Sequence, residues 1–519
     1  MVALDATSLP VALPVSCIAR LPSLLLSLPS EQQLNNVQVI SKDLGGSAVE
    51  AFWSATSFLL ASTVFQPIIA AFSNLYGRKA LMNVSLVFFF VGSVVIAAGK
   101  NFTTVIIGRT VQGSGGGGIT CLTTLIIVDK IPLRERGKWI SLVGAMFSIG
   151  TVTGPLLGGG LAKQTLWRWI FWINLPILGI ATVLIALFLD TAKEPGSFIG
   201  KLGVLDWVGM ALFLPSATGF MIPITRGGVE CPWDSWRTLV PLFVSSAGLI
   251  AFAMHQEYVA TNPLIRTSVF KNLSASIILF QTIIYGIILG AVFLYLPLYF
   301  EAVKGMSPVM AGVAIFPWTL TVAPCAMITG IAISKTAQYR WANWLGWCLT
   351  VLGMSFLVCL KSDTSTGVWI VLCLVGGVGL GILYPAMLIA VQASSSTENQ
   401  TYSTNLFTFF RAFGQALGIA VGGVVFQNMM ERRMLSKPLV SDMAKEYSRD
   451  AVGLVQIIKA MPETEMKKQL TESFTYALMY TWVFVAVLSG FALVASFFLK
   501  GYELSSPEEV EQRNADDKK

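Results

Sequence analysis

The sequence predicts an all-α membrane protein with about fourteen transmembrane helices. Hydrophobic residues make up 54% of its 519 positions and charged residues only 12%, whereas soluble domains carry roughly 25% charged residues. A helix needs about 20 mostly apolar residues to cross about 30 Å of hydrocarbon. Thirteen charge-free runs of 19 or more residues meet this need: 51–77, 80–99, 110–128, 139–162, 169–189, 207–225, 238–256, 272–300, 305–334, 341–360, 364–397, 412–430 and 473–499.

Two of the spans need a separate argument. The opening segment Val2–Val15 is apolar except for Asp5, but its 14 residues are too few to cross alone. We count it as an incomplete first span, which brings the predicted total to fourteen. The helix that contains the run 110–128 is expected to start near Phe102, so that Arg109 lies inside it.

Lysine and arginine in the short loops predict the orientation, because cytoplasmic loops carry an excess of these residues. With a cytoplasmic N-terminus, the inner loops hold twelve of them and the outer loops seven. The long segment 431–472 then lies outside, where Val452, Val455 and Ile458 have the spacing of a short amphipathic helix. The tail 501–519 is polar and charged and is predicted to be disordered.

Composition argues against several other classes of protein. The net charge of +7 comes from basic residues scattered through short loops, whereas nucleic-acid binding calls for a basic patch on one face. The seven cysteines form no C-x-x-C pair, and His255 is the single histidine, so we expect no metal site. The run Gly113–Gly118 lacks the Gly-Lys-Ser/Thr that a nucleotide-binding loop needs.

Two spans carry the same glycine pattern. Gly150, Gly154 and Gly158 recur every four residues around Pro155, which bends a helix, and a later span has the same spacing at Gly414, Gly418 and Gly422. Such repeats predict two related halves, as in secondary transporters. We therefore divide the chain into an N-terminal six-helix bundle (1–190), a linker with an extra two-helix hairpin (191–256), a C-terminal six-helix bundle with a long outer loop (257–500, loop 431–472) and a cytoplasmic tail (501–519).

Several motifs resemble those of the major facilitator superfamily, specifically its fourteen-span drug:proton antiporters and most closely the fungal members. The similarity covers about residues 40–500, and the fold it implies is two six-helix bundles plus an extra hairpin. The motifs that carry the resemblance are Leu4–Pro14, Gly77-Arg78-Lys79, Gly108–Gly113, the Gly154-Pro155 span, Trp167–Pro176, Leu296–Phe300 and Phe410–Gly414.

This resemblance implies a function and a setting. The expected activity is proton-coupled efflux of drug-like molecules or of a fungal secondary metabolite or toxin, by a monomer that is not an enzyme. The predicted location is the plasma membrane, with the vacuolar membrane as an alternative, and the energy comes from the proton gradient without a cofactor. The alternative function is proton-coupled import, for example of siderophore-bound iron; a membrane receptor or enzyme is a more distant alternative.

The sequence departs from the family in one loop. Relatives carry an acidic and a basic residue before Gly77-Arg78-Lys79, where this chain has Asn74 and Leu75. An inner gate built there would have to use the Asn74 amide, or rely on Arg78 and Lys79 meeting helix C-termini, whose carbonyl groups attract cations.

Ionisable residues inside spans are costly and normally serve function or pair with one another. By resemblance, Arg109 and Asp5 are the candidates for proton coupling. A structural alternative for Arg109 is that it tethers helix ends through backbone carbonyls. Asn101 begins a glycosylation sequon on the predicted outer side, in a short loop.

Polar and aromatic residues within spans could line a cavity for bulky amphipathic cargo, because small-molecule sites are mostly apolar with a few polar groups. For each residue alone, helix packing is the competing explanation. The candidates are Gln112, Gln281, Tyr285, Trp318, Tyr384, Arg411 and Gln415.

Residues 16–39 are interpreted as a retained intron. In relatives the first-span motif runs almost directly into the loop that is found here at Ile40–Gly45. Val15-Ser16 can be encoded by GTAAGT and Gln38 by CAG, so removing Val15–Gln38 would take out whole codons and join Pro14 to Val39. A missing upstream exon would complete the first span. The alternative is a genuine luminal loop.

Overall fold

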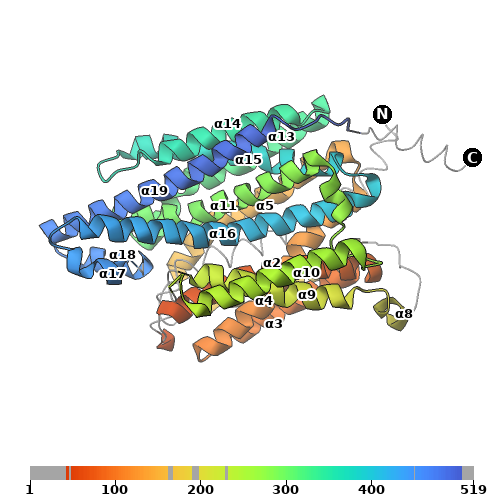
Figure 1. The fold of residues 1–519 in the computed structure, drawn as a ribbon, viewed down its shortest axis with the longest axis horizontal. Coiled ribbons are helices and arrows are strands. Elements are labelled where there is room, and N and C mark those ends of the chain that lie inside the picture. Colours follow the sequence, from red (N-terminus) through yellow and green to blue (C-terminus); the bar gives the residue numbers. More distant parts are fainter. Residues whose placement is uncertain are drawn as a thin grey trace, which may run out of the picture.

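The computed structural model describes residues 43–45, 48–161, 167–189, 198–227, 232–448 and 451–504. The predicted first span, with Asp5, and the suspected intron at 16–39 lie outside these residues, as does most of the tail. The described part is built from α-helices joined by short loops and turns of 3-10 helix. The long helices run roughly side by side along one direction (Figure 1).

The N-terminal half contains five long segments. They are α2 (Ala48–Tyr76), α3 (Arg78–Ala97), α4 (Phe102–Lys130), α5 (Leu133–Leu161) and the pair α6 (Trp169–Trp172) and α7 (Asn174–Phe188). Helix α4 starts at Phe102, as predicted, and packs between α2 and α3.

The glycine run on α4 explains this close packing. A Cβ atom at Gly113 would lie 2.5 Å from the Phe58 carbonyl oxygen on α2, and one at Gly115 would lie 2.5 Å from the Phe89 nitrogen on α3. Glycines here let two neighbouring backbones approach the same helix, a common device in membrane bundles. The run is a packing surface.

The C-terminal half contains six long segments and a small helical extension. The long segments are α11 (Leu273–Ala302), α12 (Pro308–Ala314) with α13 (Phe316–Thr336), α14 (Arg340–Leu357), α15 (Thr366–Ala393), α16 (Gln400–Leu435) and α19 (Glu465–Ser496). Between α16 and α19 lie α17 (Ala444–Tyr447) and α18 (Ala451–Ala460).

The linker forms α8 (Phe198–Leu202) and the hairpin of α9 (Trp207–Arg226) and α10 (Trp236–Tyr258). The hairpin packs through α9 on α2 and α16. Its two helices are tied where α9 begins: Asp206 accepts hydrogen bonds from Gly209 N (2.8 Å) and Gln256 Nε2 (2.6 Å) and lies 2.9 Å from His255 Nε2. Burial alone would raise the pKa of Asp206, but these hydrogen bonds hold it below its usual value.

The two halves meet along two pairs of helices. Helix α5 leaves its own half and lies against α13 and α12, while α2 lies against α16 (Figure 1). The α5–α13 crossing is tight because glycines face each other: a Cβ atom at Gly330 would lie 2.2 Å from the Gly137 carbonyl oxygen. Large exposed apolar side chains on α3, α7, α10 and α19, such as Val87, Leu187, Phe243 and Phe491, face outward, as lipid-facing surfaces require.

Eleven helices among the described residues are long and apolar enough to cross a membrane, and they match eleven of the thirteen predicted runs. The other two runs correspond to α5 and α14, which pack within the bundle. The all-helical membrane fold is thus confirmed, whereas the total of fourteen spans stays a prediction.

The predicted long outer loop at 431–472 is mostly helical. Helix α16 starts at Gln400 rather than at 412 and continues to Leu435, and α19 already begins at Glu465. Charged residues do not end a helix once it has left the hydrocarbon, so charge-free runs underestimate its length. The amphipathic helix predicted there is present as α18, which buries Val455 and Ile458.

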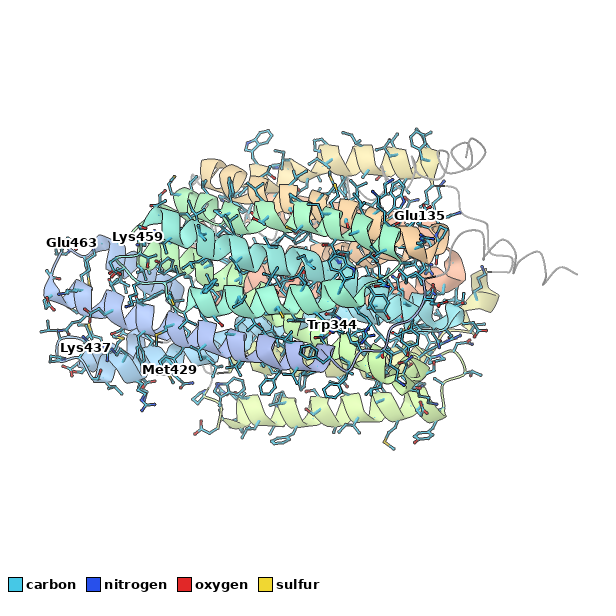
Figure 2. The ribbon with its side chains drawn as sticks, turned by 90° about the horizontal axis from the view of Figure 1, so that it is seen from above. Glu135, Trp344, Met429, Lys437, Lys459 and Glu463 are labelled. Carbon is cyan, nitrogen blue, oxygen red and sulfur yellow. The ribbon has the colours of Figure 1, made fainter. Side chains whose placement is uncertain are left out.

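This extension lies at one end of the molecule. Lys437, Lys459 and Glu463 gather there, at the end opposite to Glu135 (Figure 2). Lys459 Nζ lies 2.9 Å from Glu301 Oε2, which ties α18 to the end of α11. Glu135 belongs to the loop region that the orientation rule places inside, so the extension corresponds to the predicted outer side.

The glycine stripe of α16 packs on α11. Cβ atoms at Gly414 and Gly418 would each lie 2.2 Å from a carbonyl oxygen of α11, and one at Gly422 would lie 2.7 Å from the Tyr295 ring. On α5, Gly150 and Gly154 are buried. The surroundings of Pro155 and Gly158 lie outside the described part of the chain.

Replacing Gly418 with valine is expected to lower the thermal stability of the protein in detergent. The new side chain would collide with the Ile287 carbonyl, and overpacking of this kind costs about 1–3 kcal/mol or more. Gly490→Val on α19 is the matched control, because a Cβ atom there meets nothing within 4 Å. Equal melting temperatures for the two variants would contradict the close α11–α16 contact.

Candidate functional site

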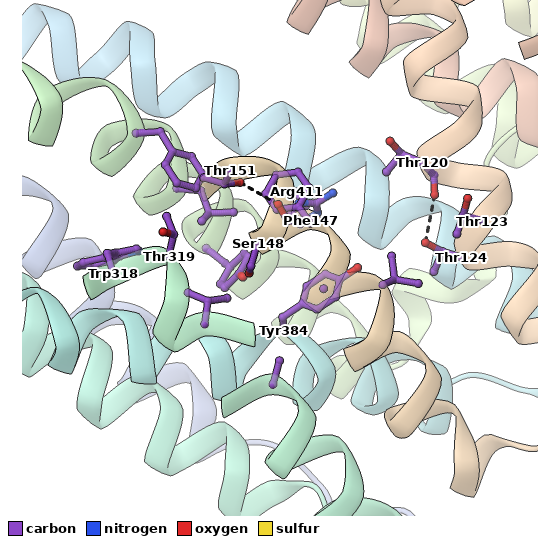
Figure 3. Close-up of a pocket in the computed structure, with 17 residues that line it drawn as sticks. Thr120, Thr123, Thr124, Phe147, Ser148, Thr151, Trp318, Thr319, Tyr384 and Arg411 are labelled. Carbon is purple, nitrogen blue, oxygen red and sulfur yellow. Dashed lines mark hydrogen bonds between the residues drawn. The ribbon is translucent and has the colours of Figure 1, made fainter. Parts of the chain in front are cut away.

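A cavity lies between the two halves and is lined by six helices. About 900 Å³ of space free of protein atoms lies within its outline, and this figure includes open solvent. In Figure 3, the threonines of α4 and the Trp318–Thr319 pair of α13 lie on opposite sides, with Arg411 and Tyr384 between them. The lining residues are Thr120, Thr123, Thr124, Val143, Gly144, Phe147, Ser148, Thr151, Tyr285, Leu289, Phe293, Trp318, Thr319, Val322, Ala326, Tyr384 and Arg411.

The body of this cavity is apolar and aromatic, with one charge. Arg411 is the only charged side chain among the described lining residues, and its guanidinium carbon lies 5.7 Å from the centroid of the Tyr384 ring. Within the described part of the chain, Arg411 forms no ion pair. The arrangement suits a bulky amphipathic molecule with a polar group near the middle.

Several buried polar groups at this cavity lack a protein partner. Trp318 Nε1, Thr319 Oγ1, Thr123 Oγ1 and Arg411 Nε accept or donate no hydrogen bond within the described residues, although Trp318 is 0% and Thr319 4% exposed. Buried polar groups are almost always paired. A cluster of unpaired ones around a cavity indicates a place where a ligand or water completes the hydrogen bonding.

Four of the seven residues proposed for the cavity from sequence do line it: Tyr285, Trp318, Tyr384 and Arg411. The three glutamines do not. Gln112 bonds Arg109 and Ser93, and Gln281 donates to the Ala492 carbonyl and accepts from Asn343. Gln415 lies at the glycine contact between α16 and α11.

Sequence reasoning missed the threonines, Phe147, Ser148 and Phe293. These residue types occur throughout apolar spans, so nothing in their local pattern separates a lining position from a packing position. These residues share one feature: they line the same cavity from helices that are far apart in the sequence. Only the fold shows this.

Arg109 lies outside the cavity, deep in the N-terminal half. It is 1% exposed, and its Nε donates to the Ser54 carbonyl of α2 (3.1 Å) and its Nη1 to Gln112 Oε1 (2.6 Å). Its guanidinium carbon lies 4.6 Å from the Phe58 ring centroid. No carboxylate pairs with it among the described residues, and Asp5 lies outside them. The carbonyl contact is the one that the tethering alternative requires.

The loop between α2 and α3 has both kinds of contact expected for an inner gate: a hydrogen bond to the Asn74 amide and bonds from Arg78 and Lys79 to the ends of other helices. Gly77 has φ +88°, a backbone conformation that favours glycine. Arg78 donates to Asn74 Oδ1 (2.7 Å) and to Ser73, and it forms an ion pair with Asp129 at the end of α4 (2.8 Å). Lys79 Nζ donates to the Ala186 carbonyl in the last turn of α7 (2.9 Å).

Further hydrogen bonds at this end join the two halves. Arg136 donates to Gln392 Oε1 (3.2 Å) and Gln400 Oε1 (2.8 Å), and Arg134 donates to the Ser334 carbonyl (3.0 Å). Ser141 Oγ donates to the Ala326 carbonyl (2.7 Å), and Cys121 Sγ lies 3.2 Å from Asn405 Oδ1. These contacts close the predicted cytoplasmic end of the space between the halves.

At the opposite end, the tryptophan-rich motif binds the segment before α2. Asp43 accepts hydrogen bonds from Trp167 Nε1 and Arg168 Nη1, both at 2.9 Å. The hydrogen bond from Trp167, supported by that from Arg168, holds the pKa of Asp43 below its usual value despite slight desolvation. Asn101 is exposed, but its side-chain oxygen already caps α4 by accepting from Thr104 N (2.9 Å). Its glycosylation stays a prediction.

The fold and the cavity together define a class of protein: an integral membrane transporter with two helical halves around a central site. The chain belongs to the Major Facilitator Superfamily, whose family model matches residues 16–419.

Relatives and solved structures agree with this assignment. The chain is 56% identical over 512 residues to "MFS transporter L2" of Phoma sp., covering 99% of this chain and 82% of the relative. It is 32% identical over 473 residues to "Efflux pump FUS6" of Gibberella fujikuroi, covering 90% and 84%, and 33% identical over 472 residues to "MFS-type efflux pump LUC4" of Fusarium sp., covering 90% and 83%.

Two solved structures share the fold. The proton:xylose symporter XylE superposes with a TM-score of 0.60 at 14% identity, covering 96% of this chain and 98% of that one. The human organic anion transporter MFSD10 (TETRAN) gives a TM-score of 0.56 at 16% identity, covering 93% and 99%. At such low identity these likenesses concern the fold alone.

Proposed function

We propose that the chain is a fourteen-span, proton-coupled efflux transporter that exports a small organic compound, drug-like or a fungal secondary metabolite or toxin, across the plasma membrane. The single observation that carries the proposal is the central cavity between the halves, whose described wall is mostly apolar and aromatic with one charged side chain, Arg411. The efflux direction is supported by the relatives named as efflux pumps. The monomer would work without a cofactor.

In this proposal the two halves rock against each other around the cavity, as in other transporters built from repeats. The structure has contacts at the predicted inner end, through Arg136, Arg134 and Ser141. Export requires these contacts to break so that cargo can enter from inside, and to form again while cargo leaves outward. Proton binding would drive the return, with Arg109 as the candidate that adjusts the affinity of a nearby acid for protons.

Deleting the gene in the organism that carries it is expected to retain one or more compounds in the cells and to deplete them from the medium. Untargeted mass spectrometry of cells and medium measures both. Reintroducing the full chain should restore export, and a protonophore should abolish it. An unchanged distribution of all compounds would contradict efflux, and a loss of uptake from the medium would favour the importer alternative.

A further inference from the structure

We propose that the cavity selects cargo with an acidic group, a carboxylate or similar anion on an apolar body, and excludes organic cations. This inference rests on the proposed transport role of the cavity and names the class of its cargo. It comes from the balance of donors, acceptors and charge in the cavity wall.

The first step is the charge. Arg411 is an always-ionised side chain on α16, a helix long and apolar enough to cross the membrane, and it lines the cavity without an ion-pair partner among the described residues. A charge in such a place is costly unless something pairs with it. A cargo anion supplies that partner, whereas a cationic cargo would add repulsion at short range in a medium of low dielectric.

The second step is the hydrogen bonding. Arg411 Nε and Trp318 Nε1 are donors only, and both are buried without a partner. The Thr319 and Thr123 hydroxyls are also unpaired. An acidic group beside Arg411 can accept from its Nε, while an ammonium group, which only donates, would leave this guanidinium nitrogen unpaired at a cost.

The third step is the shape of the wall. In Figure 3, Arg411 lies between the Trp318–Thr319 side and the threonine side of α4. A planar guanidinium can hold a carboxylate through two parallel hydrogen bonds. An acid held at this point leaves an apolar body to fill the aromatic space toward Trp318 and Phe293.

Binding of two dyes that share a three-ring xanthene core tests this selectivity. Fluorescein is an anion at pH 7.5 and rhodamine 123 is a cation, and the fluorescence anisotropy of each reports binding to the purified full chain in lipid nanodiscs. We expect fluorescein to bind with a Kd at least about tenfold lower than rhodamine 123, since one charge-assisted contact supplies about that factor.

Variants of Arg411 assign the effect. Arg411→Gln should weaken fluorescein binding about tenfold or more and leave rhodamine 123 binding equal or stronger, and Arg411→Lys should recover part of the loss. Arg433→Gln is the control: it removes a charge from the same helix, at a site beside Tyr476 away from the cavity, and should change neither Kd.

The proposal is overturned if wild-type protein does not bind fluorescein, if it binds rhodamine 123 as well or better, or if Arg411→Gln leaves the fluorescein Kd unchanged. Because binding needs neither a gradient nor net export, this result is independent of the gene-deletion experiment. If the retained compounds prove to be cations, the proposed acidic cargo is wrong and the efflux role stands. If fluorescein binds but the deletion strain retains no compound, the efflux role is wrong and the preference of the cavity for anions stands.

Discussion

Replacing Arg109 with alanine is expected to abolish export against a concentration gradient while the protein still reaches the membrane. The guanidinium is almost completely buried in α4, where a charge is expensive. Its contacts are a carbonyl of α2, the amide of Gln112 and an aromatic face. These contacts hold the cation in one position without neutralising it. A positive charge fixed in this way lowers the pKa of any acid that approaches it, which is what coupling to protons requires.

The experiment must separate coupling from tethering. Cells or proteoliposomes are assayed with the compounds retained by the deletion strain, both for uphill export and for exchange of labelled against unlabelled cargo without a gradient. A coupling role predicts that Arg109→Ala loses uphill export and keeps exchange. A tethering role predicts that both fall together with the melting temperature, because the bond from α4 to the Ser54 carbonyl is lost.

Arg237→Ala serves as the control, since Arg237 is exposed at the start of α10. Arg109→Lys adds a second comparison, because lysine keeps the charge and loses the rigid fork of donors. Uphill export at the wild-type rate in Arg109→Ala would refute the coupling role.

Most of the fold could be predicted from the sequence because a membrane places a simple constraint on the residues of a spanning helix. Charged side chains are excluded from hydrocarbon, so each charge-free run marks a segment that crosses. The method failed at the ends of α16 and α19, which continue beyond the hydrocarbon into the helical extension at the outer end. No rule about membrane crossing limits a helix there, and the charges of Glu431 and Glu472 therefore gave wrong boundaries.

The candidate site was less accessible to sequence reasoning. Tyr384 and Arg411 stood out because they are polar or charged within apolar runs, and the fold brings them together at one cavity. Gln281 stood out for the same reason, but its amide is satisfied by the neighbouring α14 and α19. A polar side chain in a span indicates that it has a partner, and the sequence does not say whether that partner is cargo or another helix.

Arg136 shows a different limit. In the sequence it belongs to a basic stretch between two charge-free runs, where the rule that cytoplasmic loops are positive already accounts for an arginine. Its two glutamine partners are more than 250 positions away, on α15 and at the start of α16. Nothing in the local pattern distinguished it from Lys138, which is exposed two residues later.

Replacing Arg136 with alanine is therefore expected to open the inner end of the transporter. The Arg136 side chain is 7% exposed and donates to four acceptors: the carbonyls of Ile131 (2.7 Å) and Val128 (2.8 Å) in its own half, and Gln392 and Gln400 in the other. Each hydrogen bond to a charged group contributes about 1.5–3 kcal/mol to stability. Loss of about 3 kcal/mol from the closed form would shift the ratio of closed to open protein roughly a hundredfold.

Cys121 offers a native reporter of this shift. It is fully buried on α4, where its sulfur contacts Asn405 of the opposite half. In a chain whose other cysteines are replaced by serine, Arg136→Ala should raise the rate at which N-ethylmaleimide labels Cys121, and export should fall because the outward-facing form is less populated. Lys138→Ala is the matched control on the same helix. If Arg136→Ala lowers the melting temperature but leaves Cys121 unreactive, Arg136 stabilises the fold without acting as a latch between the halves, and the inner gate must be sought at Arg78 and Asp129 instead.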